Sequence, residues 1–264
     1  MSADERRRIA VSDPHGHPAE LTAALRAAGL VDDEGAWSGA DARLFVLGDF
    51  LDRGPDGIGV IDLVMRLARE APDSGGEVRS LLGNHEALAL GMYHFGPGSD
   101  GTPSHRAQTF ASSWMRNGGL ASDQERLTAV HLDWLRSLPA IIHDDDLLLL
   151  HSDTLEYLEW GGTVDEINET VRVALASGGA DESWLCWERL TDRYAFMGEG
   201  GAATARDLMA TLGGSRIVHG HSIIADLTGV PPPEVTGPWS YADGLVLAID
   251  GGLYAGGPLL VVDL

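Results

Sequence analysis

Five short segments of this 264-residue chain place carboxylate, imidazole or amide groups directly after apolar runs. In the first, Asp13 and His15 stand two residues apart and can both reach one cation, while Gly16 lets the backbone turn tightly beside them. In the second, Asp49 follows an apolar run directly, which suits a carboxylate that bridges two metal ions. The residue types and their spacing therefore predict metal chemistry.

Groups next to these candidates suit phosphate binding and proton transfer. Arg53 presents a planar fork of donors to two phosphate oxygens, although it could instead form a surface ion pair with Asp52. Asn84 offers a neutral carbonyl oxygen to a metal or marks the start of a helix as its cap, and both interpretations can hold together. His85 titrates near neutral pH, so it suits proton donation.

Histidines supply the remaining candidates. His151 follows four leucines, and His219 and His221 flank a glycine after another apolar run. A lone buried histidine is usually structural, but histidines at two separate strand ends are harder to explain as core residues. These side chains are therefore further candidate metal ligands.

The elements that must position these groups are short buried strands with helices between them. Short apolar runs, bounded by turn residues, are typical of buried strands. Runs of three to five residues fall at 8–11, 44–47, 78–82, 147–150, 216–218, 245–249 and 258–262. Helical patterns occupy 18–28, 58–69 and 163–176, so the chain is predicted to be an α/β protein. Ligands of α/β sheets gather beyond the carboxyl ends of the strands. The segment GGLYAGG between the last two runs is expected to form a hairpin, which would make the sheet mixed.

Composition excludes several kinds of chemistry. The 18 basic residues are all arginine, which rules out a Schiff-base lysine or a P-loop lysine. The net charge of −22 argues against a nucleic-acid partner. The single cysteine, Cys186, cannot form a disulfide within the chain and is expected to be a buried apolar residue. No apolar stretch is long enough for a membrane helix and no signal peptide is evident, so a cytoplasmic location is expected.

The five motifs together resemble those of the calcineurin-like metallophosphoesterases, and among them the bacterial phosphoprotein-phosphatase branch. That branch carries GDxHG, GDxxDRG and GNHE followed by two later histidines, and this chain has SDPHG, GDFLDRG, GNHE, LLLLHSD and VHGHS. The resemblance spans residues 9 to 264. The chain departs from the pattern at Ser12, where glycine is common, and at Ser152 and Asp153, where two glycines are usual; Asp153 could alter substrate preference or metal affinity.

The resemblance implies a role for each candidate. It assigns six metal ligands, of which Asp49 bridges both ions, Asp13 and His15 hold the first ion, and the second is held by Asn84, His151 and His221. His221 is preferred to His219 because the family ligand follows a glycine. The resemblance also makes His85 the proton donor, oriented by Asp52, and Arg53 a phosphate clamp. Arg189, in the segment LCWER, is the expected second phosphate arginine, with an ordinary helix-surface arginine as the alternative.

The resemblance also implies a fold and an activity. The expected fold is a single four-layer αββα domain over residues 1–264, with a possible lid or insertion around 93–134 that carries Tyr93, Phe95, Phe110 and Trp114. The expected cofactors are two divalent ions, manganese or iron, with zinc or nickel as alternatives. The implied reaction is hydrolysis of phosphate monoesters by in-line attack of a metal-bridging hydroxide.

Three functional hypotheses follow. The first is a phosphatase acting on phosphorylated serine and threonine of proteins. The second is a phosphatase of small molecules or nucleotides, including a dinucleoside-polyphosphate hydrolase. The third is a non-catalytic binding module on the same fold, which would be expected to lack some of the ligands found here. The partner is in either enzymatic case a phosphorylated substrate, and the oligomeric state stays open.

Overall fold

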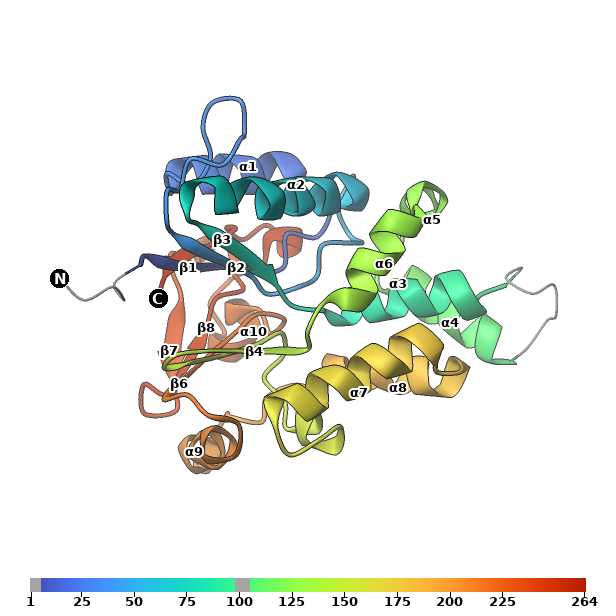
Figure 1. The fold of residues 1–264 in the computed structure, drawn as a ribbon. Helices are drawn as coiled ribbons and strands as arrows, with labels where there is room; N and C mark the ends of the chain where they lie inside the picture. Colours follow the sequence, from blue (N-terminus) through green and yellow to red (C-terminus); the bar gives the residue numbers. More distant parts are fainter. Residues whose placement is uncertain (1–5, 98–104) are drawn as a thin grey trace.

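The computed structural model describes residues 6–97 and 105–264. These residues form nine strands in two sheets, with strand orders β3-β2-β1-β9 and β4-β5-β6-β8-β7 (Figure 1). The first sheet consists of β1 (Arg8–Val11), β2 (Arg43–Val46), β3 (Glu77–Ser80) and β9 (Val261–Asp263). The second consists of β4 (Ile141–Asp144), β5 (Leu147–Leu150), β6 (Arg216–His219), β7 (Trp239–Tyr241) and β8 (Val246–Ala248).

The direction of each strand decides which strand ends can meet. In the first sheet β1, β2 and β3 are parallel and only the edge strand β9 is antiparallel. In the second sheet β5, β6 and β8 are parallel, and antiparallel β4 and β7 lie at its two edges. Six parallel strands therefore direct their carboxyl ends toward one end of the pair of sheets, and both sheets are mixed, as expected.

The packing confirms the predicted four layers. Alternate residues of a strand point to opposite faces of a sheet, so Ala10 and Phe45 enter the core between the sheets with Leu149, while Ile9 and Val11 pack outward. Helices cover both outer faces, with α1 and α2 on one side of the sheets and α7 and α9 on the other (Figure 1). Both faces of each sheet are thereby buried, which explains why strand residues such as those of β5 are all leucine.

The helices follow from capping residues and apolar spacing. The described helices are α1 (Pro18–Ala27), α2 (Gly57–Glu70), α3 (Asn84–Phe95), α4 (His105–Arg116), α5 (Ala121–Arg126), α6 (Ala129–Ser137), α7 (Val164–Ser177), α8 (Ala180–Thr191), α9 (Gly201–Leu212) and α10 (Ile224–Thr228), with short 3₁₀ turns at Ala71–Ser74, Glu156–Glu159, Pro232–Glu234 and Leu253–Ala255. Asp56 caps α2 by accepting a hydrogen bond from the Gly59 N–H at 2.8 Å. Thr163 caps α7 in the same way, and Ile167 and Val171 form its buried face.

The hairpin expected at GGLYAGG is wrong. β8 and β9, the strands on either side of it, belong to different sheets, so this segment carries the chain from the second sheet back to the first. It contains a 3₁₀ turn, Leu253–Ala255, and β9 then pairs with β1. A glycine-rich link between two strands predicts that the chain reverses direction. Which strand the returning chain pairs with depends on how the two sheets pack.

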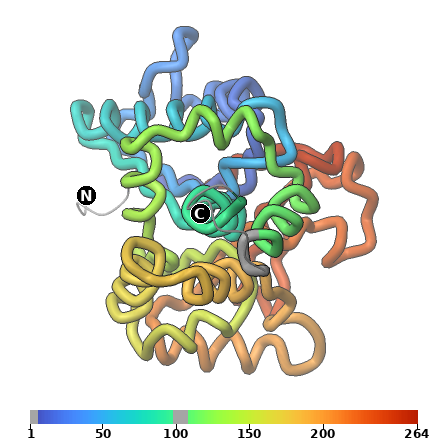
Figure 2. Tube along the Cα trace, turned by 90° about the vertical axis from the view of Figure 1, so that its right-hand side faces the viewer, coloured from blue at the N-terminus to red at the C-terminus, as the bar shows by residue number. Residues whose placement is uncertain are grey.

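The segment from α3 to α6 projects from the end of the sheets where the six parallel strands finish. Viewed from that end, α6 and α8 lie on opposite sides of α3 (Figure 2). Phe110 and Trp114 of α4 are buried against Leu88 of α3, while Tyr93 is 42% exposed. Two of the aromatic groups therefore belong to a small core. The lid function of segment 93–134 stays a prediction, and positions 98–104 of that segment lie outside the described residues.

Within the described ranges, no helix has both the length and the apolar character that crossing a bilayer requires.

Candidate metal centre

The six candidate ligands lie at the carboxyl ends of five parallel strands. Asp13 and His15 follow β1 and Asp49 follows β2, while the later ligands follow β3, β5 and β6. All six are buried, and His221, the most exposed, shows only 7% of its surface. Strands far apart in sequence therefore bring these side chains to one place, at the end where the two sheets meet.

Each candidate histidine ligand has one ring nitrogen fixed by a backbone carbonyl. His15 Nδ1 lies 3.0 Å from the Leu51 oxygen and His151 Nδ1 lies 2.7 Å from the Leu47 oxygen. His221 uses its other nitrogen, Nε2, which lies 3.1 Å from the oxygen of Thr191. A ring N–H donated to a carbonyl fixes the tautomer and leaves the second nitrogen as a metal ligand. The backbone therefore prepares three imidazoles to bind cations.

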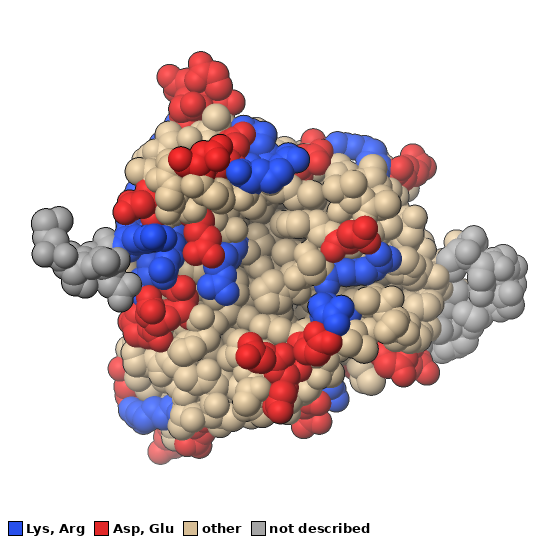
Figure 3. Space-filling model, viewed as in Figure 1, with Lys and Arg blue, Asp and Glu red and all other residues tan. Residues whose placement is uncertain are grey.

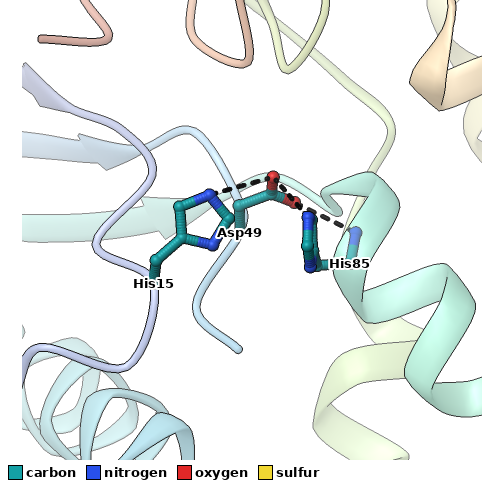
Figure 4. A group of neighbouring side chains, drawn as sticks. All are labelled: His15, Asp49 and His85. Carbon is teal, nitrogen blue, oxygen red and sulfur yellow. Dashed lines mark hydrogen bonds and ion pairs between the residues drawn. The ribbon is translucent and has the colours of Figure 1, made fainter. Parts of the chain in front are cut away.

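The carboxylate of Asp49 is shared by two groups of possible ligands. In the described residues, His15, Asp49 and His85 form one group, and Asp49, His151 and His221 form the other. Asp49 Oδ2 lies 3.7 Å from His15 Nε2 and 3.9 Å from His85 Nε2, with the carboxylate between the two rings (Figure 4). Its second oxygen, Oδ1, lies 3.4 Å from His151 Nε2. One carboxylate thus faces both groups, which suits a bridging ligand.

Asn84 also faces the centre. It is the first residue of α3, and Gly83 rather than Asn84 is the cap of that helix. The Asn84 side-chain oxygen lies 3.0 Å from His151 Nε2. The amide is therefore free of the capping role and is directed at the second ligand group.

The electrostatics of the site call for cations. Burial and the neighbouring Asp13 carboxylate raise the pKa of Asp49 well above its usual range, and the same two causes raise the pKa of Asp250. Burial also lowers the pKa of His15 well below its usual value. Among the described residues, Asp13 Oδ1, His85 Nε2 and Asp250 Oδ2 are buried polar atoms without a hydrogen-bond partner. Divalent cations would supply the missing partners and the opposite charge, so the residues present fit a metal centre of mixed oxygen and nitrogen ligands.

The backbone at the centre is strained. Several residues other than glycine have positive φ angles, a conformation that side chains with a Cβ rarely adopt; they include Asp13 (54°), His15 (38°), Asp49 (55°), Asp52 (66°), Arg53 (65°) and His221 (61°). Strain of this kind concentrates at functional sites and persists only where the surrounding structure enforces it. The tight turns therefore aim the side chains inward at a cost in stability.

Glu86 enforces one of these turns. Its Oε2 atom accepts hydrogen bonds from the N–H groups of Asp49 at 2.8 Å and Gly83 at 3.0 Å. Its Oε1 atom accepts from Phe50 at 2.9 Å and Leu51 at 3.3 Å. The GNHE motif thus ends in a scaffold residue, which joins the start of α3 to the turn that carries Asp49.

His85 and Asp52 form a buried pair beside the candidate ligands. His85 Nδ1 lies 2.7 Å from Asp52 Oδ2, and His85 Nε2 faces the centre. Burial raises the pKa of Asp52 to about 7, while burial and nearby cationic groups lower the pKa of His85. Near neutral pH, Asp52 and His85 Nδ1 can therefore share one proton. When His85 Nε2 gives up its own proton, the shared proton passes from Asp52 to Nδ1.

Arg53 lies at the exposed mouth of the centre. Its Nη1 atom is 3.1 Å from His15 Nε2, and its guanidinium lies 3.9 Å from the centre of the Tyr254 ring. The aromatic ring supports the cation from one side. The charge is thus held next to the candidate ligands.

Arg189, the expected second phosphate arginine, is not brought into this group. Its guanidinium lies 3.6 Å from Glu156 and 3.7 Å from Glu159, on the outer side of α8. Arg193 lies near His221 instead, because its Nε donates at 3.4 Å to the Thr191 carbonyl that His221 Nε2 also contacts. α8 ends at Thr191, so Arg193 lies beyond the helix that carries Arg189.

His219 and Asp153 are engaged elsewhere. His219 Nε2 lies 2.8 Å from the Tyr241 hydroxyl, and its Nδ1 is 2.8 Å from the Gly220 oxygen, so neither nitrogen is left for a metal. Asp153 accepts hydrogen bonds from Ser222 Oγ at 2.5 Å and from the Tyr194 N–H at 3.0 Å. Asp153 therefore fixes the chain next to Arg193 and Ser222.

Asp250 is a residue of the centre that sequence reasoning left out. It follows β8, the sixth parallel strand, and is 2% exposed. The carboxylates of Asp13 and Asp49 both raise its pKa, which places it close to them. Its position after a run of apolar residues, the same signal that marked Asp13 and Asp49, could have identified it.

The surface gives phosphate little long-range attraction. On the face shown in Figure 3, arginines lie interspersed with carboxylates, and its described part carries no broad basic area. With a net charge of −22, the protein as a whole repels anions. Binding of a phosphate group would therefore depend on charges within the centre.

Comparisons with known proteins identify related chains. The model of the calcineurin-like phosphoesterase family matches residues 7–224. Shewanella-like protein phosphatase 2 of Arabidopsis thaliana is 34% identical over 84 residues, which cover 32% of this chain and 22% of the relative. A symmetrical bis(5'-nucleosyl)-tetraphosphatase of Photorhabdus laumondii is 31% identical over 140 residues, 53% of this chain and 41% of the relative. This chain thus matches less than half the length of these two relatives.

A solved structure extends the similarity to nearly the whole chain. The cold-active protein-tyrosine phosphatase of a psychrophilic Shewanella species has a TM-score of 0.70 at 22% identity, with 97% of this chain and 74% of that chain covered. At this identity the likeness establishes the shared fold.

Proposed function

This chain belongs to the calcineurin-like phosphoesterase family, and from that premise we propose that it is a phosphomonoesterase that depends on two divalent metal ions. The observation that carries the proposal is the Asp49 carboxylate, which faces two groups of potential ligands at once. Asp13 and His15 would complete the first metal site. Asn84, His151 and His221 would complete the second.

Mixed oxygen and imidazole ligands without thiolate suit manganese, iron, zinc or nickel, and the resemblance to the metallophosphoesterases favours manganese or iron. When bound, two such ions supply a nucleophilic hydroxide at neutral pH and neutralise charge on the phosphoryl group. The arginines at the mouth of the centre would hold the phosphate. Arg53 and Arg193 would donate to its equatorial oxygens and stabilise the charge that spreads over them during transfer.

The leaving group would receive its proton from His85. Its Nε2 atom has no hydrogen-bond partner among the described residues, while Nδ1 is held at 2.7 Å by Asp52. Asp52 fixes the orientation of the ring and can replace the proton that the ring gives up. This arrangement would matter most for esters with poor leaving groups, whose departing oxygen needs the proton.

We favour phosphorylated proteins as substrates. The similarity to a protein phosphatase and the fold shared with a protein-tyrosine phosphatase support this choice. A dinucleoside-polyphosphate hydrolase is the second candidate, because the bis(5'-nucleosyl)-tetraphosphatase matches a longer stretch of this chain than the plant protein phosphatase does. For such a substrate, the rings of Tyr194 and Tyr254, which are 43% and 42% exposed, would offer surfaces on which a nucleotide base can stack.

The test begins with metal-stripped protein and Mn²⁺ added back. Hydrolysis of p-nitrophenyl phosphate, phosphoserine, phosphothreonine and phosphotyrosine peptides, a nucleoside monophosphate and a dinucleoside tetraphosphate is compared. Metal-dependent hydrolysis of any of them supports the proposal, and the best substrate selects between the candidates. Asp49→Asn should lower both the metal content per chain and the turnover. Wild-type turnover by Asp49→Asn with metals present would contradict a bridging carboxylate, and no turnover by folded wild-type protein with any metal would favour the binding module.

A further inference from the structure

The turn after α4 touches the loop between β2 and α2, which carries Arg53 and is called the Arg53 loop below. The N–H of Arg53 donates a hydrogen bond to the carbonyl oxygen of Gly118 at 2.9 Å. Arg53 has a positive φ angle of 65°, and Asp52 before it has one of 66°. A backbone strained in this way persists only where its surroundings support it. The Gly118 carbonyl supplies part of that support.

The absence of a side chain at position 118 allows this close approach. A Cβ atom on Gly118 would lie 3.0 Å from Arg53 Cγ, 3.1 Å from its backbone nitrogen and 3.2 Å from its Cα. Carbon atoms in favourable contact are about 3.5–4.0 Å apart, so a larger residue at this position would push Arg53 away by a few tenths of an ångström. The turn therefore holds Arg53 by a hydrogen bond and by packing against the base of its side chain.

Two further contacts tie the same part of the chain to the far end of the Arg53 loop. Asp123 of α5 is 3% exposed, and its Oδ2 atom accepts a hydrogen bond from the Gly57 N–H at 3.1 Å. Arg126 of the same helix forms an ion pair with Asp56 at 2.7 Å. The segment from α3 to α6 thus contacts both ends of the loop, so the two must move together.

We propose that Gly118 is a positioning residue for Arg53, so that the segment from α3 to α6 helps to place the guanidinium that binds phosphate. The inference rests on the proposed function, in which Arg53 donates to the phosphate. The Arg53 guanidinium lies 3.1 Å from His15 Nε2 and 3.9 Å from the centre of the Tyr254 ring. Displacing the base of the side chain would shift the guanidinium from this place. Phosphate affinity should then fall while metal binding stays intact.

Two variants and a matched control separate the contact with Arg53 from backbone strain. Gly118→Ala adds a methyl group that meets Arg53 and also strains the backbone, because Gly118 has a φ of 85°. Gly118→Asn adds the same Cβ, but asparagine tolerates the left-handed conformation better. Gly244, in the exposed turn before β8, has a φ of 81° and no described atom within 4 Å of where its Cβ would lie. Gly244→Ala therefore carries the strain without the contact.

The experiment is calorimetric titration of the Mn²⁺-loaded protein with inorganic phosphate. Complete loss of a hydrogen bond to a charged group costs about 10- to 150-fold in affinity, so displacement of Arg53 should weaken phosphate binding by about 3- to 30-fold in both Gly118 variants. Gly244→Ala should stay within about twofold of wild type. In an Arg53→Ala background, Gly118→Ala should cause no further loss. The Mn²⁺ content per chain should equal that of wild type in both Gly118 variants.

A second readout does not depend on phosphate. In an NMR measurement of amide hydrogen exchange, the Arg53 amide should exchange faster in Gly118→Ala than in wild type, because its hydrogen bond is displaced, whereas Gly244→Ala should leave it unchanged. Wild-type phosphate affinity in either Gly118 variant, an equal loss in Gly244→Ala, a full additional loss in the Arg53→Ala background or unchanged exchange at Arg53 would overturn the inference. If wild-type protein binds no phosphate and hydrolyses no ester, the proposed function fails, and exchange at Arg53 still tests whether the turn holds the loop.

Discussion

Glu86 offers a sharp test of how the turn that carries Asp49 is held in place. Its two carboxylate oxygens accept four hydrogen bonds from the N–H groups of Asp49, Phe50, Leu51 and Gly83. Glu86→Gln keeps the size and shape of the side chain but replaces one oxygen with an NH₂ group. That group would face two backbone donors, which would then be buried without an acceptor.

The size of the effect follows from those two donors. A buried polar group left without a partner costs about 1–3 kcal/mol, so the free energy of unfolding should fall by about 2–6 kcal/mol. Because a domain of this size changes its Tm by about 2–4 °C for each kcal/mol, the Tm should fall by roughly 4–24 °C. Affinity for Mn²⁺ should also fall, since the displaced turn carries the proposed bridging ligand.

The assay is urea unfolding of metal-free protein, followed by circular dichroism. Glu182→Gln is the matched control, because Glu182 makes the same bond three residues back, to the Gly179 N–H at 2.9 Å, but on an exposed surface. Its replacement should cost under about 0.5 kcal/mol. If Glu86→Gln unfolds within about 1 kcal/mol of wild type, or costs no more than Glu182→Gln, the turn does not depend on the carboxylate as argued.

Three further predictions concern the arginines, the proton and the metals. Arg193→Ala should lower kcat/KM for a phosphate monoester by about 10- to 150-fold, as expected for one lost hydrogen bond to a charged group, whereas Arg189→Ala should change it by less than about threefold. Because burial raises the pKa of Asp52 to about 7, the pair with His85 keeps its extra proton below that pH and loses it above. The kcat for phenyl phosphate should therefore fall as the pH rises through about 7, and Asp52→Asn should abolish that limb. Removing metals with a chelator should lower the Tm, since ions that bind only the folded state stabilise it, and adding Mn²⁺ should restore it.

Each of these has a clear contrary result. Loss of activity in Arg189→Ala but not in Arg193→Ala would restore the assignment made from the motif LCWER. A pH profile that is the same for Asp52→Asn and wild type would remove Asp52 from the proton path. An unchanged Tm on chelation, with metal loss verified by elemental analysis, would show that the buried carboxylates do not need cations for stability.

Much of the fold could be predicted because the apolar runs, the turn residues that bound them and the helical spacing between them all indicated the same α/β arrangement. The run of leucines at 147–150 is buried on both faces of its strand and became β5 with the predicted bounds. Cys186 is buried as expected, and burial raises the pKa of its thiol to about 12. The prediction failed at GGLYAGG, since a reversal of the chain is a local property whereas the choice of a partner strand depends on how two sheets pack.

The sequence by itself predicted most of the side chains that lie at the centre, although Asp250 was left out. Asp13, Asp49 and His151 each follow an apolar strand, and parallel strands bring their carboxyl ends together, so their meeting could be inferred from order alone. The chemistry of the donor set was likewise determined, because residue types do not depend on the fold.

Only the tertiary structure decided the direction of each side chain and the supports around it. Arg189 and Arg193 are four residues apart, yet the first lies beside Glu156 and Glu159 and the second beside the Thr191 carbonyl that His221 contacts. The Gly118 carbonyl accepts a hydrogen bond at 2.9 Å from the N–H of Arg53, 65 positions earlier in the chain. Contacts of this kind join segments that are far apart in sequence, so no local sequence pattern predicts them. They form because packed elements exclude water, and each buried polar group then needs a hydrogen-bond partner among its neighbours.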